Sequence, residues 1–307
     1  MTATTWERFK DSSFYWSFRR DKVAVASFAV LCVFVAASFL APLIAPYNPY
    51  DPTQIDLMDS EMPPVWIAEG DERFLLGTDG QGRDLLSTIL YGTRISLTIG
   101  ICAVILQAML GISIGLVAGY RGGRLDNFLM RVADIQLSFS TLMVAIIVLA
   151  VFQGLFDTEL YERLAILMLI LVIGIAEWPQ YARTVRASVL AEKKKEYVDA
   201  VRVIGLGPLR IMFRHILPNT LSPLLVISTV QIANAILNEA ALSFLGLGMP
   251  ITRPSLGSLI NSGFEFILSG VWWITIIPGV VLVILVLVMN LLGDFMRDVL
   301  NPKLYKE

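Results

Sequence analysis

Acidic and basic residues are absent from five long stretches of this 307-residue chain. The charge-free stretches are 23–50, 95–120, 135–156, 216–238 and 266–293, each 22 to 28 residues long. A helix rises about 1.5 Å per residue, so each stretch can cross a hydrocarbon core of roughly 30 Å. A sixth, shorter stretch, 164–176, reaches about residue 182 if Glu177 is allowed near its end. The pattern predicts an all-α integral membrane protein with six transmembrane helices and excludes a soluble globular protein.

The rest of the composition excludes further classes. The 24 basic and 26 acidic residues leave no basic domain for binding nucleic acid. The apolar run after residue 22 is longer than the roughly 7 to 15 residues of a cleavable signal core, so we expect a retained first span. Cys32 and Cys102 both lie inside predicted spans, without the spacing of a metal or redox site. We expect them to be packing residues, with no metal site and no disulfide scaffold.

Lysine and arginine gather on one side of this topology. Six spans place both termini on the same side, and 19 of the 24 basic residues fall in the segments there, 1–22, 120–134, 181–215 and 294–307. Because cytoplasmic loops are enriched in basic residues, we expect both termini to be cytoplasmic. The predicted spans are approximately 23–45, 97–119, 128–152, 163–182, 221–246 and 273–294.

The predicted organisation follows from these spans. It comprises a cytoplasmic tail (1–22), the first transmembrane helix (23–45), an extracytoplasmic loop (46–92), a core of five transmembrane helices (93–298) with a cytoplasmic loop (183–218), and a second cytoplasmic tail (299–307). The extracytoplasmic loop holds nine acidic residues and five prolines, and a loop of that length is ordered only by packing on something else. Two interpretations stay open, a surface for an extracytoplasmic partner and a connection kept soluble by its charge.

Three glycines repeat every four residues in the second predicted span. Gly111, Gly115 and Gly119 fall on one helix face, which predicts close packing against another helix. The same stretch contains a Gly-x-Ser-x-Gly pattern, which is typical of a hydrolase nucleophile. A serine hydrolase also needs a base, and the single histidine, His215, is predicted to be cytoplasmic. We therefore expect no catalytic residues here.

The cytoplasmic loop is too long for a simple connection and looks helical twice. Its first half has no glycine or proline; Gly205-Leu206-Gly207-Pro208 then interrupts it, and a second short helix is predicted from Leu209 to Leu217. Tyr197, Val198, Val201 and Ile204 are spaced as one apolar helix face. Such a face packs on the chain's own helices, lies on the membrane surface, or docks into another protein. The pattern alone does not choose between them.

The loop resembles the EAA loop of ABC importer permeases, the coupling helix that inserts into a cleft of the ATPase subunit. Asp199-Ala200-Val201 occupies the Glu-Ala-Ala position, Gly205 follows at the expected spacing, and Leu217-Pro218 closes the motif. The departures are Asp for Glu and Val for Ala. The ATPase-coupling residues that the resemblance implies are Glu196, Tyr197, Val198, Asp199, Ala200, Val201, Ile204, Gly205, Leu217 and Pro218.

Three further stretches resemble the dipeptide/oligopeptide permease family, in its C-type subunit. They are residues 76–97 with Leu-Gly-Thr-Asp and Gly-Arg-Asp, residues 239–248 with Ala-Leu-Ser-Phe-Leu-Gly-Leu-Gly, and residues 290–302. One departure is Leu256, where the family usually has Trp. The resemblance implies a type I ABC importer permease fold in the bacterial inner membrane. It also implies a second permease subunit, two ATPase subunits that bind ATP and Mg, and an extracytoplasmic solute-binding protein.

No Gly-Lys-Ser/Thr phosphate-binding loop occurs in the sequence, so ATP hydrolysis is expected in partner subunits and not in this chain. The resemblance favours di- or oligopeptides as the transported solute. Other members carry nickel complexes, opines, glutathione or oligosaccharides, and these remain alternatives. Within the membrane we expect contacts with lipid but none with nucleic acid.

Polar residues form a stripe along the fifth predicted span. Ser228, Gln231, Asn234 and Asn238 share one face of an otherwise apolar helix, and Gln107 is a weaker candidate in the second span. Because polar groups in hydrocarbon are costly, the stripe faces another helix, another subunit or a water-filled path. We favour lining of the translocation path over hydrogen bonding between helices.

Glu177, Glu239 and Asp134 are the carboxylates that a rival function, a proton-coupled secondary carrier, would require. In such a carrier an intramembrane carboxylate is the coupling site. All three residues are predicted to lie near helix ends or at the membrane interface, which argues against that rival.

Overall fold

The computed structural model describes residues 13–300, and every regular element in that range is a helix. Residues 1–12 of the predicted N-terminal tail and 301–307 of the predicted C-terminal tail lie outside the described residues. The longer helices are α2 (Ser13–Arg20), α3 (Lys22–Phe39), α5 (Leu85–Arg121), α6 (Gly123–Leu137), α7 (Thr141–Leu155), α8 (Thr158–Glu192), α9 (Glu196–Val203), α11 (Leu221–Phe244), α12 (Leu256–Phe264) and α13 (Trp273–Val299). The short elements are α4 (Ala41–Ile44), α10 (Pro208–Arg210), a π-helix (Ile211–Ile216), and the 3₁₀ turns Pro52–Gln54, Leu57–Asp59, Leu217–Thr220 and Ile267–Ser269.

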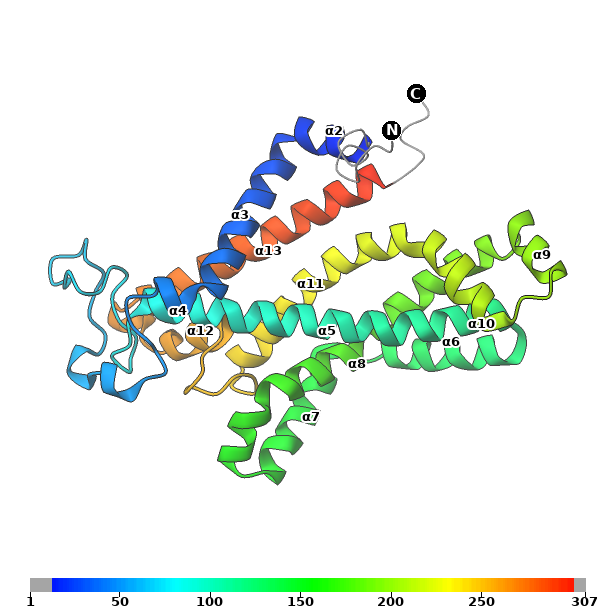
Figure 1. The fold of residues 1–307 in the computed structure, drawn as a ribbon. Helices are drawn as coiled ribbons and strands as arrows, with labels where there is room; N and C mark the ends of the chain where they lie inside the picture. The colour runs from blue at the N-terminus through cyan, green and yellow to red at the C-terminus, as the bar shows by residue number, and fades with distance from the viewer. Residues whose placement is uncertain (1–12, 301–307) are drawn as a thin grey trace.

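The helices form an elongated body, with the loop between α4 and α5 (residues 45–84, the outer loop) at one end and α9 at the other (Figure 1). Helix α5 runs along most of this length, with α8 and α11 packed on it, while α3 and α13 lie side by side and lead to the two termini. Helix α12 lies near the end that carries the outer loop.

Four of these helices are long and apolar enough to cross a membrane. They are α3, α5, the continuous run Pro208–Phe244, and α13; a fifth candidate is the pair α6 and α7, which bends by 80°. The predicted span 128–152 therefore corresponds to two helices with a sharp bend between them. Helix α6 ends at Leu137 and the hydroxyl of Ser138 donates to Asp134 O at 2.8 Å, while Ser140 is extended. The fourth predicted span, 163–182, is the middle of α8, which continues to Glu192 through Pro179.

The second long helix begins earlier than the charge pattern predicts. Asp84 caps α5, its carboxylate accepting from Ser87 N at 2.8 Å. Helix α5 therefore starts at Leu85, inside the predicted loop (46–92) and 12 residues before the predicted second span (97–119).

The outer loop is anchored by buried polar groups. Arg83 forms an ion pair with Asp79 at 2.7 Å, with side-chain exposures of 3% and 2%, and donates to Ile251 O at 2.9 Å. Trp273 Nε1 donates to Thr78 O at 3.2 Å. Burial desolvates the Asp84 carboxyl and raises its pKa. The loop is thus tied to the segment after α11 and to the start of α13.

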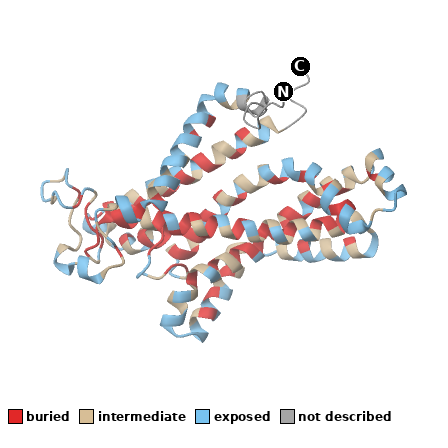
Figure 2. Ribbon diagram, in the orientation of Figure 1, coloured by how far each residue is buried: buried red, intermediate tan, exposed pale blue. Residues whose placement is uncertain are grey.

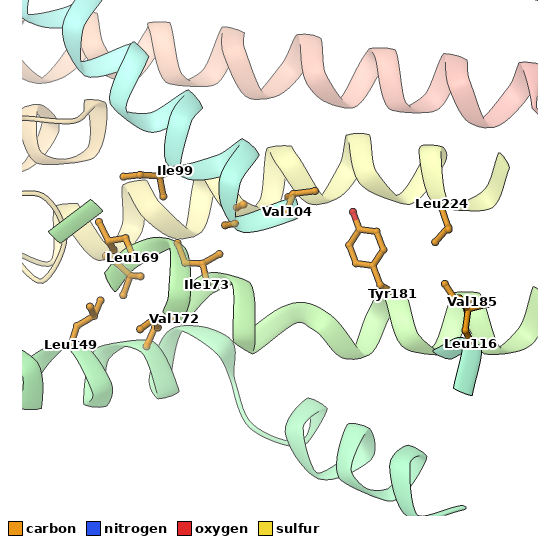
Figure 3. Close-up of a cluster of buried hydrophobic side chains, with 14 of the residues drawn as sticks. Ile99, Val104, Leu116, Leu149, Leu169, Val172, Ile173, Tyr181, Val185 and Leu224 are labelled. Atoms are coloured by element: carbon orange, nitrogen blue, oxygen red, sulfur yellow. The ribbon is translucent and has the colours of Figure 1, made fainter. Parts of the chain in front are cut away.

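Helices α5 and α8 make the most extensive helix contact within residues 13–300. A side chain at Gly115 would lie 2.6 Å from Ala182 O and 2.8 Å from Val185 Cβ, and one at Gly119 would lie 2.8 Å from Val189 Cβ. Gly111 faces Tyr181 in the same way. The buried cluster in Figure 3 continues this contact, with Leu116, Tyr181 and Val185 at one end and Ile99, Val104 and Ile173 toward the other. The glycine stripe thus sets the spacing of α5 and α8.

Candidate functional site

The turn between α9 and α10 is fixed by Gly205. Its φ is +84°, a left-handed backbone that disfavours a side chain, and open space surrounds the position. Gly205 N donates to Arg202 O at 2.9 Å and Leu206 N donates to Val201 O at 3.2 Å. These two bonds form a Schellman motif, which ends α9 and fixes the direction of the chain beyond it.

Residues 196–220 form an elbow, with α9 as its first arm and residues 208–220 as its second arm. Tyr197 joins the two arms. Its hydroxyl donates to Glu192 at 2.7 Å, and Asn219 Nδ2 donates to that hydroxyl at 3.2 Å and to His215 O at 2.8 Å. Partial desolvation, helped by the hydrogen bond and the charge of Glu192, raises the pKa of Tyr197. Lys193 adds a tie to the end of α5 by donating to Gly119 O at 2.7 Å.

The apolar face predicted on the elbow is divided by the structure. Val198 is fully buried, and Tyr197 and Val201 are half-buried against the main core, so these three pack on the chain's own helices. Ile204 remains 75% exposed and stands beside Val203, which is 88% exposed. One part of the face therefore packs on the chain's own helices, and Ile204 stays exposed.

Three residues of the exposed apolar tip were not singled out from the sequence. Val203, Leu209 and Phe213 are all more than half exposed, and with Ile204 they lie before and after the Gly205 turn in the chain. Val203 does not fit the spacing of Tyr197, Val198 and Val201 because it faces away from the core. Leu209 and Phe213 belong to the second arm, for which no apolar face was considered.

The remaining residues predicted to couple to the ATPase are exposed on α9 or belong to the second arm. Glu196, Asp199 and Ala200 are exposed on α9, and Asp199 forms an ion pair with Arg202 at 3.0 Å. Leu217 and Pro218 begin the 3₁₀ turn that follows the π-helix and leads directly into α11. The second arm and α11 are therefore one continuous run, so a displacement of the elbow reaches the helix that carries the polar stripe.

A cavity of about 690 Å³ opens between α8, α11 and α13. Gln180 and Thr184 of α8 line it, as do Gln231 and Asn234 of α11, so two members of the predicted stripe share one hollow. The lining also includes Ser222, Pro223, Val226, Ile227, Val230, Gly293, Asp294, Arg297 and Leu300. This mixture of amides, hydroxyls, one acid and one base suits a polar solute with hydrogen-bonding groups.

Gln231 connects this cavity to the interior of the chain. Its side chain is buried and donates to Gln107 Oε1 at 3.3 Å, while Gln107 donates to Ile173 O at 3.3 Å. Asn234 is exposed and donates to Gln231 Oε1 at 3.1 Å. The chain of amides thus runs from α5 through α11 to the cavity, so hydrogen bonding between helices and exposure to the cavity occur in the same group of residues.

Ser228 and Asn238 are not among the residues that line this cavity. Ser228 accepts a hydrogen bond from Tyr181 at 2.9 Å and donates to Leu224 O at 2.7 Å. Asn238 is half-buried one turn beyond the cavity. Only part of the predicted stripe therefore faces the hollow in this structure.

The three carboxylates weighed for a proton carrier have different surroundings. Asp134 lies near the end of α6, as predicted, and pairs with Arg183. Glu177 lies inside α8, not near its end, and accepts from Thr141 and Gln180, each at 2.6 Å. Glu239 lies in the last two turns of α11, where it is fully buried and accepts from Ser96 and Ser243 at 2.7 Å each. Packing of α12 and α5 over this end of α11 accounts for its burial.

Comparison with protein families gives two matches. Residues 111–306 match the family described as binding-protein-dependent transport system inner membrane component. Residues 12–64 match the N-terminal transmembrane domain of oligopeptide transport permease C.

Several curated proteins are similar over nearly the whole chain. The dipeptide transport system permease protein DppC of Haemophilus influenzae is 39% identical over 291 residues, covering 95% of this chain and 94% of its own. The di/tripeptide transport system permease protein DppC of Pseudomonas aeruginosa is 38% identical, covering 95% and 91%. A putative peptide transport system permease protein of Brucella abortus is 43% identical over 76% of this chain and 75% of its own.

A solved structure supports the fold. The MetNI methionine ABC transporter in an inward-facing conformation matches with a TM-score of 0.54 and 19% sequence identity, covering 69% of this chain and 96% of that one. At this identity the match concerns the fold, and it agrees with the predicted type I ABC importer permease architecture.

Proposed function

The chain belongs to the family of binding-protein-dependent transport system inner membrane components, and on that premise we propose that it forms half of a path for di- or oligopeptides. The proposal rests chiefly on one observation. The exposed tip around Gly205 is continuous, through residues 208–220, with the helix whose Gln231 and Asn234 line the cavity. A force applied at the tip therefore acts on the wall of the path.

The peptide substrate is supported by the names of the relatives and by the chemistry of the cavity. The similar proteins from H. influenzae and P. aeruginosa are dipeptide and di/tripeptide permeases. A short peptide carries two charged ends and several amide groups, and the cavity presents Asp294, Arg297, Gln180, Gln231 and Asn234. Nickel complexes, opines, glutathione and oligosaccharides are the competing solutes.

We propose that the elbow receives the movement of separate ATPase subunits, in which ATP and Mg are bound. Val203, Ile204, Leu209 and Phe213 supply an exposed apolar tip that is suited to a cleft in such a subunit. The proposed assembly also contains a second permease subunit across the path and an extracytoplasmic solute-binding protein. In this arrangement both termini and the elbow are cytoplasmic, the outer loop is extracytoplasmic, and the spans number six if α8 and the bent pair α6 and α7 each count as one.

The test is uptake of a labelled dipeptide by proteoliposomes that contain the assembled transporter and its binding protein. Uptake should require ATP, and Asp199→Lys should lower it at unchanged membrane insertion because it reverses a charge on the exposed face of α9. Asp199→Asn is the matched control that removes the charge without reversing it. Dipeptide uptake by the chain alone, driven by a proton gradient, would refute the proposal, as would ATP-dependent uptake that Asp199→Lys leaves at the normal rate.

A further inference from the structure

Helix α2 meets α3 at a corner that is held in place on both sides. The ring of Phe18 packs edge-on against Phe28 of α3 at 5.6 Å and against Phe295 of α13 at 5.5 Å. Asp21 caps α3, accepting from Val23 N at 2.9 Å and from Ala24 N at 3.1 Å. Helix α2 therefore has a defined orientation at the end of the α3 and α13 pair (Figure 1).

The opposite face of α2 is aromatic and basic. Trp16, Arg19 and Arg20 are spaced i, i+3 and i+4, so they share one side of the helix, while Phe18 points the other way. All three are exposed, and together with Ser17 they line a hollow of about 490 Å³. Within residues 13–300, neither arginine forms an ion pair with an acidic side chain.

An apolar groove begins two residues beyond this basic face. It has a volume of about 370 Å³ and lies between residues 22–30 of α3 and Val288 and Leu291 of α13. Lys22 is its single charged lining residue and also has no acidic partner among the described residues. Helix α3 is exposed along most of its surface, as the pale blue ribbon in Figure 2 shows.

We propose that this corner binds an anionic phospholipid, with the phosphate at Arg19, Arg20 and Lys22 and an acyl chain in the groove beside Val30 and Val288. Guanidinium groups bind phosphate by paired hydrogen bonds, and indole rings favour the membrane interface, where Trp16 would lie. Basic pockets beside transmembrane helices are suited to anionic headgroups. The apolar groove selects a lipid over a free phosphate ion, which has no acyl chain to place there. The site is separate from the elbow and the cavity and adds lipid binding to the proposed function.

The experiment is native mass spectrometry of the detergent-purified transporter, titrated with phosphatidylglycerol, phosphatidylcholine or inorganic phosphate. We expect phosphatidylglycerol to bind preferentially and Arg19→Gln/Arg20→Gln to weaken it about 25-fold, since each basic residue at an anionic surface contributes about fivefold. The matched control is Arg121→Gln/Arg124→Gln, which removes two exposed arginines at the junction of α5 and α6 and should leave the affinity unchanged.

Circular dichroism and size exclusion of each variant check that the fold and the assembly persist. A second variant, Val30→Gln, keeps all the charges and places a polar group in the groove, so it should weaken lipid binding with no effect on phosphate. Equal affinity for phosphatidylglycerol and phosphatidylcholine would overturn the proposal. So would equal losses in the two double-arginine variants, or displacement of the lipid by inorganic phosphate at matched concentration. None of these readouts depends on peptide transport, so failure here and failure of the proposed function are distinguishable.

Discussion

The elbow contains two glycines two residues apart, and the same substitution should have different effects at the two positions. Gly205 has φ +84°, whereas Gly207 has φ −65° and ψ 148°, which any residue adopts; neither would bring an added Cβ within 4 Å of another atom. Substitution by alanine therefore changes only the backbone energy. Gly205→Ala forces an L-residue into a left-handed conformation, whereas Gly207→Ala introduces no strain.

The expected magnitude follows from the backbone alone. A left-handed conformation costs an L-residue about 1–2 kcal/mol, which raises the population of opened turns roughly 5- to 30-fold. Gly205→Pro should cost about 3 kcal/mol or more, because proline fixes φ near −65° and removes the amide that donates to Arg202 O at 2.9 Å. The predicted order of damage is Gly205→Pro, then Gly205→Ala, with Gly207→Ala close to the parent protein.

Hydrogen exchange of the peptide that contains Leu206 measures the opening directly, because this amide bonds to Val201 O. Peptide uptake per ATP hydrolysed, in the reconstituted transporter, measures the functional consequence. Exchange should become faster, and uptake per ATP hydrolysed should fall, in the same order across the three variants. Equal behaviour of Gly205→Ala and Gly207→Ala in both assays would refute the argument that the left-handed turn sets the geometry of the elbow.

Three further predictions concern packing, the outer loop and pH. Gly115→Ala would place a methyl group 2.6 Å from Ala182 O and should cost about 1–3 kcal/mol, seen as a lower Tm in detergent, whereas Gly154→Ala, with no atom within 4 Å, should not lower it. Arg83→Ala breaks a buried ion pair and should cost about 3–5 kcal/mol by the same assay, while Arg163→Ala, which breaks an exposed pair, should leave the Tm unchanged. Hydrogen bonds from the side chain and backbone of Thr53 lower the pKa of Asp51, so the stabilisation they give is present above the usual carboxyl range and is lost as the pH falls through that lowered pKa. Protease cleavage of the outer loop should therefore rise at acid pH in the parent and should depend less on pH in Asp51→Asn.

Much of the fold could be predicted because membrane helices are marked in the sequence by long runs without charged residues. Four of the five charge-free stretches overlap α3, α5, α11 and α13, and the glycine stripe of α5 meets α8 as its spacing indicates. The bend between α6 and α7 was not predicted because the whole of 135–156 is uncharged, and a charge pattern contains no information on helix direction. The early start of α5 was not predicted because its N-cap residue, Asp84, was counted among the acidic residues of a loop.

The elbow was located correctly, but its orientation was not predictable from the sequence. Helical spacing groups Tyr197, Val198 and Val201 into one face, yet spacing alone does not say whether that face packs inward or stays exposed. The exposed tip spans Gly205, whose left-handed turn ends α9 and separates Ile204 from Leu209 of the next arm. The burial of Glu239 was not predictable for a related reason, because the helix α12 that covers it follows a loop whose path no local pattern describes.

The π-helix of residues 211–216 lies between the Gly205 turn and α11, so its hydrogen bonding sets the rotation of α11 relative to the elbow. A π turn contains more residues than an α turn, so these six residues hold surplus length within a continuous run that ends in α11. If a partner at the elbow tightened them to α-helical hydrogen bonding, the rest of the run would rotate about its own axis. Gln231 and Asn234 would then rotate around the cavity wall. The path would change its chemistry by rotation, presenting amides in one state and the neighbouring apolar face of α11 in the other.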